Sequence, residues 1–110
     1  MHDLTRAWSA TAAGTNAGAT ATKAADTGTK WVVTHISGFN DQNHTLQLKD
    51  GSTVLAEWEF DISVSGTAFE IAGVWPCSAN TAVTAVLGGS NADCQVNMAG
   101  YTIGAADVTI

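Results

Sequence analysis

Three acidic side chains occupy alternate positions in one short segment, at Glu57, Glu59 and Asp61. In a β-strand this spacing places all three on the same face. Such carboxylates could bind calcium or serve as the acid and base of a glycosidase. Calcium, however, prefers more oxygen ligands, carried on loops, and a glycosidase needs two carboxyls that face each other across a cleft. The pattern therefore favours a solvated strand face, and a glycosidase based on Glu57 or Glu59 is the least favoured function.

The other signatures of catalysis or metal binding are weak. His35 and His44 could meet across a turn, but two ligands do not complete a zinc site. The sequence has no Gly-x-Ser-x-Gly nucleophile motif, no phosphate-binding loop and no His-Glu-x-x-His motif. We therefore expect a protein that is not an enzyme and that needs no cofactor or metal.

The two cysteines, Cys77 and Cys94, could form a disulfide or remain free. Cys77 precedes an expected strand at 81–87, and Cys94 begins the next one, at 94–101. If these strands are successive and antiparallel, the two cysteines lie at opposite ends of the domain. A disulfide needs Cα atoms within about 7 Å of each other. This argument favours two free thiols.

The tryptophans are the strongest candidates for contact with a partner. Trp58 lies on the apolar face of an alternating segment and is expected in the core. Trp31 begins an expected strand and Trp75 ends one, so both could lie at a rim and stack on sugars. The favoured alternative is that they pack in the core or at a subunit interface. Trp8 could fill a partner's pocket or fold back onto its own domain. The candidate partner-binding residues are Leu4, Arg6, Trp8, Trp31 and Trp75.

Charge and length limit the class of protein. The four basic residues lie within the first 50 of 110 positions, where four aspartates offset them, and the six later acidic residues supply the net charge of −6. Nucleic acid and anionic membranes would repel such a chain, and no apolar run approaches the ~20 residues of a spanning helix. Its length and 45% hydrophobic content suit one domain.

Alternating apolar and polar residues predict β-strands from about position 30 onward. Segments 45–49 and 53–61 alternate on either side of Asp50-Gly51, a strong hairpin signal. Gly100 predicts a bulge or a close backbone approach. Six or seven short strands predict an all-β, antiparallel β-sandwich or barrel. The other expected strands are 31–37, 68–72, 81–87 and 94–103.

Residues 1–29 differ from the rest of the chain. Ala10–Thr29 consists mainly of alanine, threonine and glycine, which cannot form a core. This segment is expected to be an extended arm or an edge strand, ordered on a partner. The predicted division is therefore an N-terminal arm over 1–29 and a β-sandwich domain over 30–110.

Four blocks between Thr29 and Ile103 carry a resemblance to a known family. They are VTHIS at 33–37, TLQLKDGSTVL at 45–55, NTAVTAVL at 80–87 and GYTI at 100–103. In order and spacing they resemble the jelly-roll decoration, or cement, proteins of tailed-phage capsids. This chain departs from that family in having His35 where a small residue is usual, and in its cysteines.

The resemblance implies a jelly roll, a homotrimer and a place on the capsid exterior, at vertices or local symmetry axes. The expected function is a virion structural protein that binds the major capsid protein, contacts neither nucleic acid nor membrane, and stabilises the phage head by bridging capsid subunits. The alternative is a carbohydrate-binding or host-recognition module of a fibre or head surface, with Trp31 or Trp75 as the stacking platform.

Overall fold

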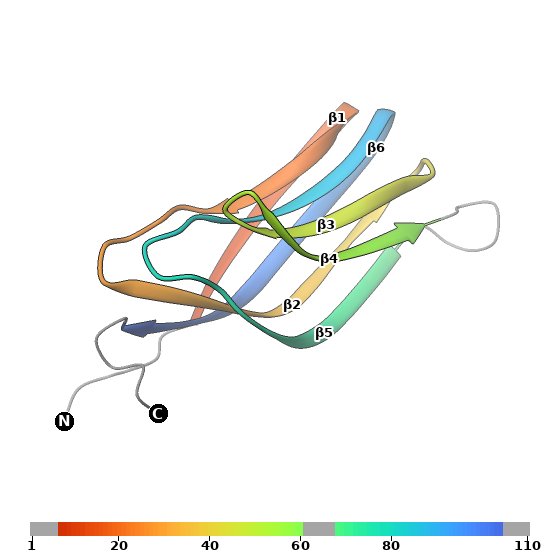
Figure 1. Ribbon diagram of the computed structural model, residues 1–110. Helices are drawn as coiled ribbons and strands as arrows, with labels where there is room; N and C mark the ends of the chain where they lie inside the picture. The colour runs from red at the N-terminus through yellow and green to blue at the C-terminus, as the bar shows by residue number, and fades with distance from the viewer. Residues whose placement is uncertain (1–6, 61–67, 105–110) are drawn as a thin grey trace.

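The computed structural model describes residues 7–60 and 68–104, except for the side chains at 89–92 and 104. These residues form six strands, and every pairing between strands is antiparallel (Figure 1). The prediction of an all-β antiparallel protein is therefore confirmed. The strands are β1 (Ala7–Lys23), β2 (Thr29–Asn40), β3 (His44–Asp50), β4 (Thr53–Phe60), β5 (Ala68–Pro76) and β6 (Val83–Gly104).

The longest strand, β6, organises the molecule. One side of it pairs with β1 over nearly its whole length. Its other side pairs with β3 from Val83 to Leu87 and with β2 from Cys94 to Gly104. Two four-stranded sheets result, in the orders β1-β6-β3-β4 and β1-β6-β2-β5, and β1 and β6 belong to both. Strands were predicted separately at 81–87 and 94–103; they are instead parts of one continuous strand.

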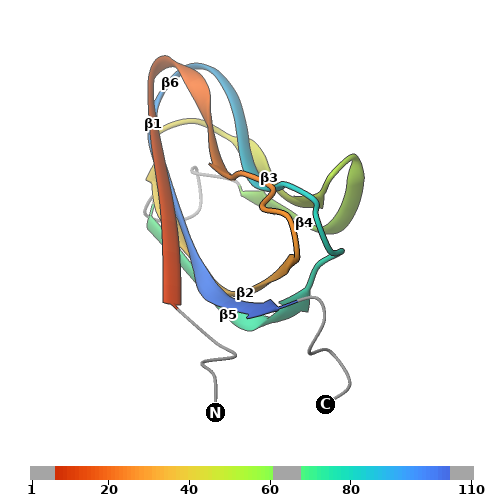
Figure 2. The same cartoon turned by 90° about the vertical axis from the view of Figure 1, so that its left-hand side faces the viewer.

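Both shared strands bend where they pass from one sheet to the other. Figure 2 shows β1 and β6 side by side as they fold over, which gives the sheet a nearly closed, barrel-like form. Register shifts in β1 lie between Thr15 and Ala19, around Asn16 with its φ of 57°. Such irregularities bend a strand and change which side chains face inward. Buried positions accordingly switch from Trp8 in the first half of β1 to Ala19 and Ala21 in the second, and in β6 from Val83, Ala85 and Leu87 to Cys94, Val96 and Met98.

The hairpin predicted around Asp50-Gly51 is confirmed as β3 and β4. Gly51 has a φ of 61°, which glycine adopts readily. Leu46 and Leu48 of β3 are fully buried. The opposite strand turns Trp58 and Phe60 toward the same core, as its alternation predicts.

The two sheets meet at an open seam between β4 and β5, the outer strands of the two sheets. Aromatic side chains bridge this seam. Trp58 of β4 meets Trp75 of β5 edge to face, with ring centroids 5.7 Å apart. Phe60 and Phe69 stack at 4.9 Å. Side-chain packing between these strands therefore contributes to closing the barrel at the seam.

The N-terminal segment is an edge strand, one of the two forms expected for it. Residues 7–23 form β1, which pairs with β6 and supplies Trp8, Ala19 and Ala21 to the core. Ala19 and Ala21 are 6% and 1% exposed, so small side chains fill this part of the core. Residues 7–23 are therefore not a free arm, and residues 1–6 lie outside the described part of the chain.

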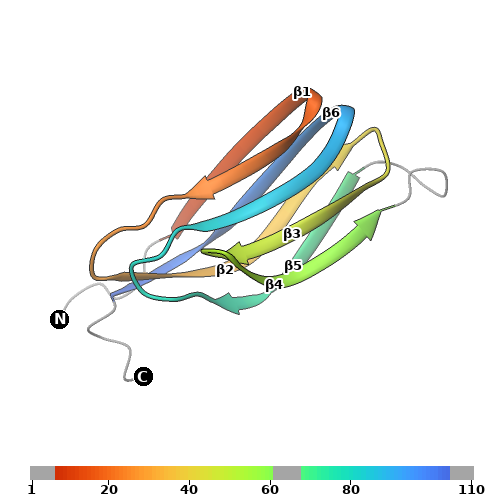
Figure 3. The ribbon, with the colours of Figure 1, turned by 45° about the horizontal axis from the view of Figure 1, so that its top comes forward.

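The barrel has two different ends, both visible in Figure 3. We call one the terminal end, because β1 starts there at Ala7 and β6 finishes there at Gly104; it also holds the turns at 24–28, 51–52 and 77–82. We call the other the bend end. It holds the bends of β1 and β6 and the turn at 41–43.

Candidate functional site

Trp8 and Trp31, two of the predicted contact residues, are buried at the terminal end. Trp31 is 4% exposed and Trp8 9%, and their rings meet edge to face at 6.0 Å. Trp8 Nε1 donates a hydrogen bond to the carbonyl of Tyr101 at 2.9 Å. The Lys23 ammonium lies 4.6 Å from the Trp31 ring centroid, within cation–π range. Trp8 therefore folds back onto its own domain, and Trp31 has no exposed face for a sugar or a partner.

The remaining predicted contact residues give no exposed aromatic platform either. Trp75 is half-buried and packs on Trp58 across the seam. Leu4 and Arg6 lie outside the described residues. The tryptophans therefore do not indicate where a partner binds.

The acidic strand face is solvated, as the alternation predicts. Glu57 and Glu59 are exposed on β4, and Glu57 accepts a 2.6 Å hydrogen bond from Nε2 of Gln47. Asp61 lies outside the described residues. Across 7–60 and 68–104, the structure brings together no group of three histidine, cysteine or acidic side chains that could hold a metal ion.

The two central histidines have different neighbours. His35 projects from the outer side of β2, with Nε2 3.4 Å from a carboxylate oxygen of Glu70. His44 stacks on Phe60 at 4.9 Å, and its Nδ1 is 2.7 Å from the carbonyl of Gln42. The two side chains therefore contact different residues.

Both cysteines are free and buried, in agreement with the prediction of two thiols. Cys77 lies beside Trp31 at the terminal end, since its amide donates to the Trp31 carbonyl. Cys94 pairs with Asn40 at the bend end. Burial, followed by the nearby Asp50 carboxylate, raises the pKa of Cys77 to about 11. Burial also raises the pKa of Cys94. Both therefore remain protonated thiols at neutral pH.

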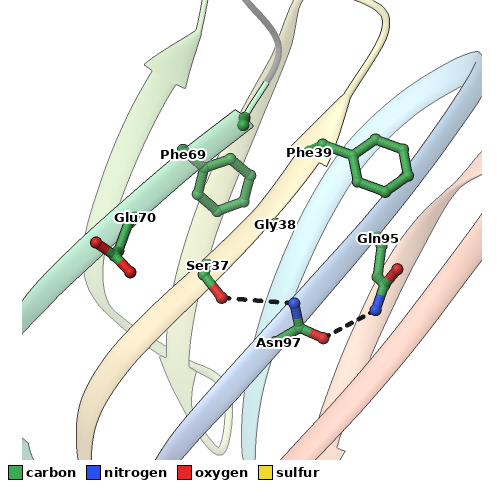
Figure 4. Close-up of a pocket in the computed structure, with 8 residues that line it drawn as sticks. Ser37, Gly38, Phe39, Phe69, Glu70, Gln95 and Asn97 are labelled. Atoms are coloured by element: carbon green, nitrogen blue, oxygen red, sulfur yellow. Dashed lines mark hydrogen bonds between the residues drawn. The ribbon is translucent and has the colours of Figure 1, made fainter.

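A shallow hollow lies on the outer side of the β1-β6-β2-β5 sheet, toward the bend end (Figure 4). We call it the Phe39 hollow, after a ring that is 43% exposed at its margin. Its volume is about 580 Å³, within the range of small-molecule sites. It is open to solvent along one side. Its lining residues are Ser37, Gly38, Phe39, Ala68, Phe69, Glu70, Gln95 and Asn97.

Hydrogen bonds hold the polar side chains of the Phe39 hollow in place. Gln95 Nε2 donates to Asn97 Oδ1 at 3.0 Å, and Asn97 Nδ2 donates to Ser37 Oγ at 3.4 Å. Thr11 of β1 also donates to Asn97 Oδ1, at 3.1 Å. Ser37 Oγ accepts in this chain, so its own hydroxyl hydrogen remains available to a ligand.

Among the described residues, lysines lie at one end of the barrel, whereas aspartates lie at both, with Asp26 and Asp50 at the terminal end. Lys30 and Lys49 lie at the terminal end, where they pair with Ile103 and Thr84, and Lys23 lies over Trp31. Asp41 and Asp93 meet at the bend end, where the Asp93 amide donates to an Asp41 carboxylate oxygen. Every lysine within the described residues is therefore at the terminal end, although the sequence alone shows only that basic residues come early in the chain.

Strand alternation could have indicated the Phe39 hollow from sequence. Ser37 and Phe39 are two apart, as are Gln95 and Asn97, so each pair shares a strand face. What the sequence does not show is that β2 lies between β5 and β6. Only the pairing of β2 with β5 places Glu70 beside these residues.

These observations define an all-β protein whose antiparallel strands form a nearly closed, barrel-like sheet. No helix of membrane-spanning length and hydrophobicity occurs among the described residues. No protein-family model matches the chain, and no curated protein matches its sequence. Among solved structures, it is similar to PRD1 vertex protein P5, with a TM-score of 0.42 and 13% identity, covering 90% of this chain and 99% of that chain.

Proposed function

We propose that this protein is a decoration, or cement, protein on the outside of a tailed-phage head. The order of the strands carries the proposal. In a jelly roll, eight strand segments pair as nested antiparallel ribbons in two four-stranded sheets. If each bent strand is counted as two segments, β1 with β6 provides the two outermost pairs, followed by β2 with β5 and β3 with β4. This is the order that the resemblance of the four sequence blocks implies.

We assign the terminal end to the capsid shell. Leu4 and Arg6, two of the candidate contact residues, precede Ala7, where β1 starts at this end. Lys30 and Lys49 lie at the same end, where together with Lys23 they outnumber the aspartates of that end, Asp26 and Asp50, by three to two. The acidic bend end, with Asp41 and Asp93, then points away from the shell, where it meets solvent and not packaged DNA.

The proposed mechanism is mechanical. A homotrimer binds the major capsid protein and bridges adjacent subunits, and the apolar area buried at their seams opposes separation of the shell. Burial contributes roughly 25 cal/mol per Å², and bridging makes the second contact of each trimer intramolecular. The mechanism needs no cofactor and no contact with nucleic acid or membrane.

Binding to heads tests this function directly. Full-length protein is mixed with empty heads assembled from the major capsid protein of the phage that carries the gene, and bound protein is measured after sedimentation. We expect binding and a higher temperature of shell rupture, and native mass spectrometry should give a trimer. Protein that stays in the supernatant at every head concentration would rule the function out.

Charge reversal tests the orientation separately. Lys30→Glu with Lys49→Glu should weaken binding to heads, because both changes place acid at the proposed contact. Asp41→Lys with Asp93→Lys is the matched control at the other end and should leave binding intact. If only the control pair weakens binding, the bend end faces the shell and the assignment is reversed.

A further inference from the structure

We propose that the Phe39 hollow binds a neutral saccharide. This site differs from the tryptophan platforms considered from sequence, which are buried or half-buried. It is also separate from the proposed capsid contact, because it lies toward the bend end: Phe39 pairs with Gln95, one position before Asn40 pairs with Cys94. The inference does not rest on the proposed function, and the isolated protein is sufficient to test it.

The aromatic ring supplies the apolar part of the site. Phe39 is 43% exposed although it lies between neighbours on two strands, Ala68 and Gln95. Both neighbours leave room beside the ring, Ala68 because it is small and Gln95 because its amide turns toward Asn97. The face of a benzene ring carries partial negative charge and attracts the weakly positive C–H edge of a neighbouring group. One side of a pyranose ring presents C–H groups of this kind.

The polar groups suit hydroxyls that both donate and accept hydrogen bonds. In the described structure, Gln95 Oε1 has no hydrogen-bond partner, and it is an acceptor. The Ser37 hydroxyl can donate. The Glu70 carboxylate, one oxygen of which lies 3.4 Å from His35 Nε2, can accept through its other oxygen. These three groups come from three adjacent strands, β6, β2 and β5, and all three line the hollow. Figure 4 shows Ser37 between Glu70 and Gln95. They present a mixed set of donors and acceptors to a ligand.

The residues that line the hollow disfavour anionic ligands and wholly apolar ligands. Glu70 is the only charged residue that lines the hollow, and its carboxylate would repel a phosphate, sulfate or carboxylate group. No lysine or arginine among the lining residues could compensate. A wholly apolar ligand would strip water from Ser37, Gln95 and Glu70 without replacing their hydrogen bonds, which is unfavourable. A neutral ligand rich in hydroxyls avoids both costs.

The network predicts that the site is formed before the ligand arrives. Asn97 accepts from both Thr11 and Gln95 and donates to Ser37, so three side chains lose little freedom on binding. This preorganisation partly compensates for the openness of the hollow. We expect a dissociation constant on the order of 1 mM for a short oligosaccharide, because much of the ligand stays in water.

The test is an NMR titration of the full-length, isotopically labelled protein. The probes are neutral trisaccharides of glucose, galactose, mannose and N-acetylglucosamine, with sialyllactose as the anionic comparison. We expect at least one neutral probe to shift the side-chain amide signals of Gln95 and Asn97 and the backbone signals of Ser37 and Phe39. Sialyllactose should shift them less at equal concentration.

Three variants locate the binding. Phe39→Ala and Gln95→Ala should each weaken it at least fivefold, and well-dispersed spectra will show that both variants are folded. Val74→Ala is the matched control, since Val74 is a 65% exposed apolar residue on the outer side of β5 and does not line the hollow. It should bind like the unaltered protein.

Several results would overturn the proposal. One is the absence of any shift with all four neutral probes at tens of millimolar. Another is binding that is unchanged in both Phe39→Ala and Gln95→Ala. A third is that the hollow signals change with protein concentration alone, which would make this surface a contact between copies of the chain.

Discussion

The lack of a side chain at Gly100 allows β6 and β2 to approach each other closely. Gly100 of β6 pairs with Val33, and a methyl group there would collide with the Val32 carbonyl oxygen and would also crowd the Trp8 ring at 3.0 Å. A backbone oxygen within a sheet cannot move aside without loss of ladder hydrogen bonds. The prediction from sequence of a close backbone approach at this glycine is therefore confirmed.

Gly100→Ala should lower the free energy of unfolding by about 2–3 kcal/mol, the cost typical of overpacking. Urea denaturation monitored by tryptophan fluorescence measures the change. Gly88→Ala is the control on the same strand, because a methyl group there would meet only the Thr45 carbonyl at an ordinary 3.5 Å. That variant should stay within about 1 kcal/mol of the unaltered protein. Equal losses in both would show that crowding at Val32 is not the cause.

Burial of the Cys77 thiol makes stability depend on alkaline pH. Its pKa is about 11 in the folded protein, above the roughly 8.5 of an exposed cysteine. Between these values the unfolded chain releases the proton first, so rising pH favours unfolding. The thiol's contribution is complete below about pH 8.5 and is lost progressively toward pH 11.

We therefore expect Cys77→Ala to flatten the fall in stability between about pH 8.5 and 10.5. Urea denaturation at a series of pH values, for both proteins, measures the two slopes. Because lysines and Tyr101 are present in both, the difference between slopes isolates the thiol. Identical slopes would contradict the prediction.

At the scale of the strand, the barrel has one hydrogen-bonded side and one open side. Along β1 and β6 the two sheets are continuous, whereas β4 and β5 meet through Trp58–Trp75 and Phe60–Phe69. Aromatic pairs of this geometry contribute about 0.5–1.5 kcal/mol beyond their burial. The seam is therefore the place where the barrel should open first.

A double-mutant cycle on Trp58 and Trp75 tests the role of the seam. Trp58→Leu and Trp75→Leu should each destabilise the protein, and together they should cost less than the sum, with a coupling of about 1 kcal/mol. Urea denaturation followed by circular dichroism measures all four proteins. Additive effects would mean that the two rings pack independently.

At the scale of the whole molecule, we assign different roles to two parts of the N-terminal segment: residues 7–23 belong to the fold, and residues 1–6 are proposed to dock. Residues 7–23 carry Trp8, Ala19 and Ala21 into the core and form an edge of both sheets. The predicted division, with an arm over 1–29 and a domain over 30–110, places β1 in the arm, although β1 pairs with β6. Only residues 1–6 remain as a candidate docking segment.

Two truncations should separate these roles. Deletion of residues 1–6 should leave the β-sheet circular-dichroism spectrum unchanged but weaken binding to heads. Deletion of residues 1–23 should abolish cooperative thermal unfolding, because β6 loses its partner along one whole side. A cooperative transition in the longer deletion would show that the rest of the chain folds without β1, in agreement with the original division at residue 29.

Local pattern determined the strands and much of the core. Alternation around Asp50-Gly51 predicted the β3–β4 hairpin and placed Trp58 and Phe60 inside, because period-two spacing is a property of the strand itself. The argument about cysteines also reached the right result, although its premise of two strands at 81–87 and 94–101 was wrong. Cys77 and Cys94 are still at opposite ends, because the bend in β6 lies just before Cys94.

Tertiary structure decided whether the tryptophans are buried and where the N-terminal segment lies in the fold. A ring at the start of a strand, such as Trp31, is exposed or buried according to what covers it, and here Trp8 and Lys23, from the two ends of β1, lie against it. The same applies to the Phe39 hollow, whose parts lie on β2, β5 and β6. Sequence determines which face of its own strand a side chain occupies. Long-range pairing determines which side chains from other strands lie beside it, and a binding surface is formed by side chains from several strands.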